Sequence, residues 1–164
     1  MIKKFPPFYW AFDLAFYCPE PYFRTIASTT YINALVLSSG TATTQSVTYA
    51  GSVWTEPVWT LSVSNTNAAA IQSLQIQNTM SGDSITAVFP GGLAASTAWT
   101  VTIDSSAMSV RDNLGNGYDV VGSAFPLLYG PAGQAQTISA TLTPVSGTAT
   151  GCTLSCVAFD RWLI

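Results

Sequence analysis

The sequence contains no histidine, and only 5 Lys or Arg and 8 Asp or Glu residues stand among its 164 positions. Without histidine, acid–base catalysis near neutral pH would fall to carboxylates. The acidic residues lie mostly at predicted turns, where Asp commonly caps its own backbone. They do not form the positioned set of groups that an active site requires. We therefore predict that the protein is not an enzyme.

Charge of either sign is also scarce, at 8% of residues and a net charge of −3. Ordinary domains carry about 25% charged residues. No basic cluster is present to neutralise a phosphate backbone, so no nucleic-acid partner is predicted. A surface of Thr, Ser, Gln and Asn with little charge repulsion favours self-association, and we expect copies of the chain to assemble with one another.

Long apolar runs are absent as well. Pro6, Pro7 and Asp13 interrupt the apolar N-terminal stretch, and no small-residue cleavage site follows it. No stretch approaches the ~20 apolar residues of a membrane-spanning helix. We expect a protein that is made in the cytoplasm, is not exported by a signal peptide and does not insert into membranes.

Cysteine is limited to Cys18, Cys152 and Cys156. The last two are four residues apart on a predicted strand, which separates their Cα atoms by ~13 Å. A disulfide requires a separation below ~7 Å. We predict reduced, buried thiols, and the lack of histidine or of paired Cys motifs predicts no metal site and no cofactor.

What the sequence has in quantity is two-residue alternation. Between Ala98 and Leu142, Trp99, Val101 and Ile103 alternate with polar residues, and a glycine-rich turn at 115–117 separates further alternating runs. About eight short strands with turns every 8–12 residues are typical of an all-β antiparallel β-sandwich or a jelly roll. We place this sandwich at residues 41–164, after a small polar stretch at 38–46.

The N-terminal stretch carries aromatic or apolar side chains at every second position from Phe8 to Cys18. In a strand they form one continuous face, which fits either a core strand or a strand that packs on a partner. The second interpretation makes residues 1–40 an extended arm that packs on another chain and not on residues 50–164. Its predicted interface residues are Phe8, Trp10, Phe12, Phe16, Tyr22 and Phe23.

Two further features allow two interpretations each. The Asp112–Asp119 stretch is rich in Gly, Asn and Asp, which fits a tight turn and loosely a calcium loop; the turn is favoured because the bidentate Glu of a calcium loop is missing. Trp54, Tyr118 and Tyr129 lie beside predicted turns. These rings either plug the ends of the core or stack against sugar rings of a glycan.

Several short motifs together resemble the distal tail protein family of long-tailed bacteriophages. They include the aromatic strand ending in Cys-Pro-Glu-Pro-Tyr at 18–22, the Gly/Thr-rich bridge at 40–48, Ser81-Gly82-Asp83, Phe125-Pro126-Leu127-Leu128 and the terminal Asp160-Arg161-Trp162. The resemblance covers roughly residues 10–164. It implies a galectin-like C-terminal sandwich joined to a remnant of an N-terminal ring-forming domain, most of which is missing.

This resemblance and the aromatic strand lead to one expected function. The protein is expected to be a structural virion protein of a phage tail tip or baseplate, bound to other tail proteins and contributing to assembly and host attachment. Two alternatives remain open: a module that binds host-surface glycan through Trp54, Tyr118 and Tyr129, and a capsid decoration protein.

Overall fold

The computed structural model describes residues 22–163, and strands are its regular elements. No helix occurs in this range, and so none that could span a membrane. The twelve strands are β1 (Tyr22–Arg24), β2 (Thr29–Val36), β3 (Ala42–Thr48), β4 (Val58–Val63), β5 (Ile71–Asn78), β6 (Ser84–Leu93), β7 (Trp99–Asp104), β8 (Ser109–Asp112), β9 (Val120–Gly122), β10 (Ala135–Pro144), β11 (Cys152–Ala158) and β12 (Arg161–Leu163).

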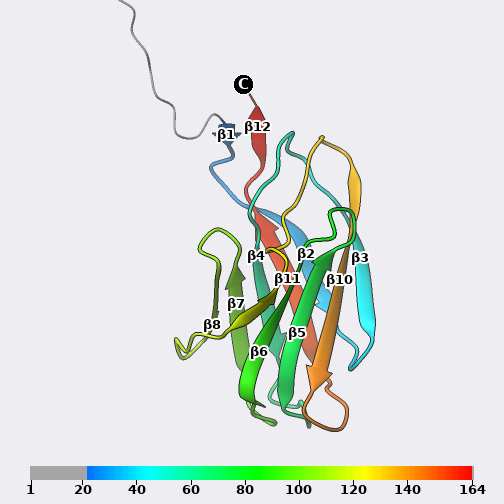
Figure 1. Ribbon diagram of the computed structural model, residues 1–164, viewed down its shortest axis with the longest axis vertical. Helices are drawn as coiled ribbons and strands as arrows, with labels where there is room; N and C mark the ends of the chain where they lie inside the picture. Colours follow the sequence, from blue (N-terminus) through cyan, green and yellow to red (C-terminus); the bar gives the residue numbers. More distant parts are fainter. Residues whose placement is uncertain (1–21, 164) are drawn as a thin grey trace, which may run out of the picture.

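Ten of these strands form two five-stranded antiparallel sheets, in the orders β3-β10-β5-β6-β9 and β2-β11-β4-β7-β8. The two sheets face each other as the layers of a β-sandwich (Figure 1). The predicted all-β antiparallel sandwich is therefore confirmed. The inner faces supply one core, whose largest fully buried side chains are Trp59, Tyr49 and Phe89.

The alternation in the sequence explains why these strands pack in this way. In β11, Cys152, Leu154 and Cys156 are buried, and the intervening Thr153 and Ser155 are partly exposed. Successive side chains of a strand point to opposite faces, so this pattern hides one face and leaves a hydroxyl-rich face outside. Cys152 and Cys156 are both free and buried, as predicted; Cys18 lies outside the described residues.

The two remaining strands, β1 and β12, form a separate two-stranded antiparallel sheet at one end of the molecule (Figure 1). Tyr22 pairs with Leu163, and Phe23 pairs with Trp162. The backbone N–H of Ser52 donates to the carbonyl of Arg161 at 2.8 Å, which fixes β12 to the loop that precedes β4. The first and last described residues are thus held side by side.

The predicted arm of residues 1–40 and the boundary near Gly40 are wrong for the part that the structure describes. Strand β2 pairs with β11 along the edge of the second sheet, and its Ile32 is fully buried in the core. Strand β1 pairs with β12 of the same chain. The sandwich therefore includes residues 29–36, because β11 needs a neighbour on the side away from β4. Residues 1–21, with Phe8, Trp10, Phe12 and Phe16, lie outside the described residues.

Candidate functional site

The most distinctive surface is at the end of the molecule that carries β1 and β12. We call Tyr22, Phe23, Trp54, Arg161 and Trp162 the aromatic pole. Phe23 is 62% exposed and Trp54 is 38% exposed. Both of the predicted interface residues that the structure describes, Tyr22 and Phe23, belong to this pole.

Arg161 organises the aromatic pole. Its guanidinium carbon lies 5.3 Å from the centroid of the Trp54 ring and 5.9 Å from that of Tyr22. The Tyr22 and Trp54 rings meet edge to face, with centroids 6.3 Å apart. Arg161 also donates to the carboxylate of Glu56 at 2.9 Å. Each cation–π contact is worth about 0.5–1 kcal/mol and the partly exposed ion pair about as much, so local contacts hold the Tyr22 and Trp54 rings in place.

A buried polar network lies between the aromatic pole and the sandwich. Asp160 is 6% exposed and accepts hydrogen bonds from the hydroxyls of Tyr31 and Thr29. Burial and the hydrogen bond to Asp160 raise the pKa of Tyr31 well above its usual value. The hydroxyl of Tyr49 accepts from the backbone N–H of Arg161 at 2.9 Å. This network ties β2 to the chain just before β12 and fixes the position of Arg161.

Close packing behind the aromatic pole also depends on Gly51. A Cβ atom at this position would lie 2.3 Å from the Tyr49 hydroxyl and 2.5 Å from the carbonyl oxygen of Arg161. Only glycine leaves room for the backbone to pass there. Close contacts therefore surround Arg161, and its charge is neutralised by Glu56, which lies just outside the aromatic pole.

The other two predicted glycan-stacking rings lie on different elements from Trp54. Tyr118 follows the β8–β9 turn, packs edge to face on Phe89 with centroids 5.0 Å apart, and donates its hydroxyl to Asp112 at 2.6 Å. Tyr129 donates its hydroxyl to Asp83 at 2.6 Å. Both rings are partly buried and engaged within the chain, as expected for rings that plug the ends of a core. Trp54 alone of the three counts among the exposed large apolar side chains.

The loop after β8 has the geometry of a turn. The carboxylate of Asp112 accepts from the backbone N–H groups of Leu114 and Asn116 at 2.9 Å each, and from the side chains of Asn116 and Tyr118. Burial alone would raise the pKa of Asp112, but these hydrogen bonds outweigh it and lower the pKa to about 2. Within the described range, no group of three or more acidic, His or Cys side chains is placed to hold a metal ion.

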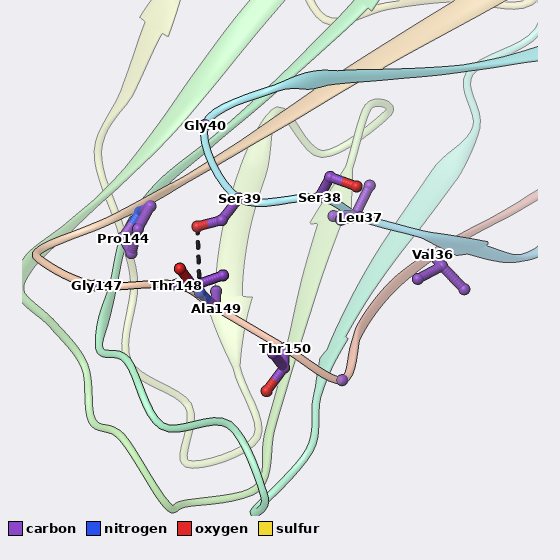
Figure 2. A pocket seen from close by; sticks show the side chains of 11 residues that line it. Val36, Leu37, Ser38, Ser39, Gly40, Pro144, Gly147, Thr148, Ala149 and Thr150 are labelled. Atoms are coloured by element: carbon purple, nitrogen blue, oxygen red, sulfur yellow. Dashed lines mark hydrogen bonds between the residues drawn. The ribbon is translucent and has the colours of Figure 1, made fainter.

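Two hollows are lined by residues other than those of the aromatic pole. One, of about 550 Å³, lies between the β2–β3 and β10–β11 connections (Figure 2). Its walls are mostly small residues and backbone, and the Ser39 hydroxyl accepts from the Ala149 N–H at 3.1 Å across it. The other, of about 500 Å³, lies where the two sheets open at their β9 and β8 edges, and is lined by Ser105, Met108 and Phe125. Sequence reasoning missed this second hollow.

Comparisons with protein-family models, with curated proteins and with solved structures gave no match to this chain.

Proposed function

We propose that this protein is a structural component of a bacteriophage tail tip, without enzymatic activity, that binds neighbouring virion proteins through the aromatic pole. The observation that carries the proposal is the set of exposed apolar side chains on and beside β1 and β12. Phe23 is 62% exposed, Ile26 is fully exposed and Leu163 is 63% exposed. Exposed apolar side chains gathered at one end of a molecule are candidates for contact with other proteins.

The charge distribution supports the same proposal. On the outer face of the first sheet, Thr44, Ser139, Gln77 and Ser84 follow one another across neighbouring strands, and the next row holds Thr141, Gln75 and Thr86. These rows carry hydroxyl and amide groups and no charge. A rigid, charge-poor sandwich with an apolar end is suited to permanent packing in an assembly. The resemblance to distal tail proteins supplies the identity of that assembly.

The glycan-binding alternative has narrower support. Sugar recognition by stacking needs exposed ring faces, and Tyr118 and Tyr129 are partly buried with their hydroxyls engaged. Trp54 remains available, although Arg161 and Tyr22 cover part of it. Binding of a host polysaccharide that is lost on Trp54→Ala would favour this alternative over the tail-tip proposal.

A complementation experiment tests the proposal. A phage with this gene disrupted is supplied with the normal chain, with Phe23→Ser or with Val145→Ser. Val145 is a matched control because it is an exposed apolar residue, at 55%, on the connection after β10 at the opposite end of the sandwich. We expect Phe23→Ser to fold normally, to fail to enter particles and to lower the infectious titre at least tenfold. Equal incorporation of the two variants would contradict the proposal.

A further inference from the structure

The two large sheets end in four edge strands, and three of these edges are short, covered or bulged. Strand β9 has three residues and β8 has four. Residues 116–118 cover the outer side of β8, since the N–H of Tyr118 donates to the Val110 carbonyl at 3.0 Å. Strand β2 shifts register twice against β11. Short length, coverage and bulges are the devices by which an edge avoids pairing with another chain.

The fourth edge, β3, has none of these devices among the described residues. It runs over seven residues, Ala42–Thr48, without proline, glycine or a charged side chain. It pairs with β10 along this whole length without a shift of register. In Figure 1 it forms the outer margin of the molecule, with β10 as its one neighbour in the sheet. A long, regular and uncharged edge is a template for pairing with a further strand.

The hydrogen bonds of β10 determine which residues of β3 are available. In an antiparallel pair, the backbone groups of successive residues point alternately to one neighbour and to the other. On β10, the Leu142 carbonyl accepts from Gly40 at 2.7 Å on the β3 side, and the Thr137 carbonyl accepts from Thr79 at 2.9 Å on the β5 side. The β3 residues that bond to β10 are therefore Thr43, Gln45 and Val47. Those whose N–H and C=O groups point away from the sheet are Ala42, Thr44, Ser46 and Thr48, and all four are exposed.

We propose that β3 pairs antiparallel with β3 of a second copy of this chain, about a two-fold axis at Gln45. Thr44 then lies opposite Ser46 of the second copy, and Ala42 lies opposite its Thr48. This register uses the outward N–H and C=O groups of all four residues. It joins the two sheets into one continuous sheet with five strands from each copy. Because each chain offers one such edge within residues 22–163, the pairing closes at two copies.

The side chains of β3 favour a second copy over an unrelated peptide. In the proposed register the hydroxyls of Thr44 and Ser46 face each other across the two strands, and such pairs stabilise a sheet. No like charges meet, because β3 carries none. A peptide that adds to a sheet edge is selected by pockets for its alternate side chains, and neither hollow described above is lined by a residue of β3. The pairing goes beyond the tail-tip proposal and does not depend on it.

Charge variants of the purified full chain test the pairing and its register. Thr44→Lys with Ser46→Lys, the repulsive variant, places like charges opposite each other across the axis. Thr44→Lys with Ser46→Glu, the attractive variant, places opposite charges at the same positions. Gln75→Lys with Gln77→Lys is the matched control, because it adds the charge of the repulsive variant on the outer face of the central strand β5.

Sedimentation velocity under reducing conditions, across a hundredfold range of concentration, measures the mass. One copy has a mass of 17.3 kDa. We expect the normal chain, the attractive variant and the control to reach twice this mass as the concentration rises. The repulsive variant should have a dissociation constant about tenfold higher than that of the normal chain. The proposal is overturned if the normal chain stays monomeric throughout, or if the repulsive variant dimerises as tightly as the attractive one.

Hydrogen exchange of single backbone amides, followed by NMR, locates the contact. In the monomer the amides of Thr43 and Gln45 should exchange slowly, and those of Thr44 and Ser46 should exchange fast. In the dimer Thr44 and Ser46 should slow at least tenfold. Fast exchange of these two amides in the dimer would overturn the proposal. Slow exchange already in the monomer would overturn it as well, because another segment of the same chain would then cover the edge.

Discussion

Replacing Asp112 with Asn should remove a measurable and pH-dependent part of the free energy of unfolding. The ionised carboxylate accepts four hydrogen bonds within the loop after β8, and they hold its pKa at about 2, below the 3.8 of an unperturbed Asp side chain. A difference of ~1.8 pKa units corresponds to at most about 2.4 kcal/mol. Water near the loop screens the interaction, so we expect Asp112→Asn to cost about 1–2 kcal/mol at pH 7.

The sign of the pH dependence follows from the lowered pKa. A carboxyl whose folded pKa lies below its unfolded value stabilises the fold fully above the unfolded pKa, and loses that contribution as the pH falls through the folded pKa. The contribution of Asp112 should be complete above pH ~5, about half lost at pH 3 and mostly lost at pH 2.

Urea unfolding followed by tryptophan fluorescence at pH 7, 4, 3 and 2 measures the contribution of Asp112 to the free energy of unfolding. The normal chain and Asp112→Asn should converge in stability as the pH falls. Tyr118→Phe serves as a control, because it removes one of the four donors and leaves the charge in place. It should cost less than Asp112→Asn at pH 7. A cost of Asp112→Asn that is the same at pH 7 and at pH 2 would refute the reasoning, because the carboxylate charge would then not be its source.

Three further predictions concern packing. Gly122→Ala should destabilise the fold by about 1–3 kcal/mol in urea unfolding, because its Cβ would lie 2.1 Å from the Ser84 carbonyl oxygen. Gly117→Ala, with open space around it, should change the stability by no more than about 0.5 kcal/mol. Equal effects of the two substitutions would contradict the packing argument. Ser105→Ala should leave stability unchanged or raise it slightly in the same assay, since it deletes an unpartnered buried hydroxyl; a large loss would show that the hydroxyl has a partner. Cys156 should resist iodoacetamide in the folded protein and react once it is unfolded, because burial raises the pKa of its thiol; mass spectrometry showing rapid native labelling would contradict this.

The sandwich was predictable because its strands alternate cleanly. In β7 and β11 the apolar positions fall two apart over the whole strand, and the structure buries the alternate positions. The sequence did not predict that β2 belongs to the sandwich, and the reason is local. Its pairing with β11 shifts register twice, so that extra residues of β2 bulge out near Tyr31 and near Asn33. Each bulge reverses which side chains face the core. Tyr31, Asn33 and Leu35 alternate in the sequence, but the alternation does not predict which of them face the core.

The candidate sites were less predictable than the fold, because they depend on contacts between distant parts of the chain. Arg161 and Glu56 are 105 residues apart, and Tyr31 and Asp160 are 129 apart. Neither pair has a spacing that local patterns can reveal. Met108 belongs to an ordinary polar–apolar alternation in the sequence, and its left-handed backbone follows from the way the Asp104 side chain closes the turn. Tyr22 and Phe23 were predicted as interface residues from the aromatic pattern, and Trp54 was predicted as a glycan-stacking ring from its position beside a turn; these roles stay predictions.

The location of the chain in an intact particle tests the tail-tip proposal most directly. Immunogold labelling with an antibody against the folded sandwich, viewed by electron microscopy of purified phage, measures it. The proposal predicts gold at the tip of the tail, and loss of this label in particles grown with Phe23→Ser. Gold spread over the capsid, or particles that contain none of this protein by mass spectrometry, would contradict it.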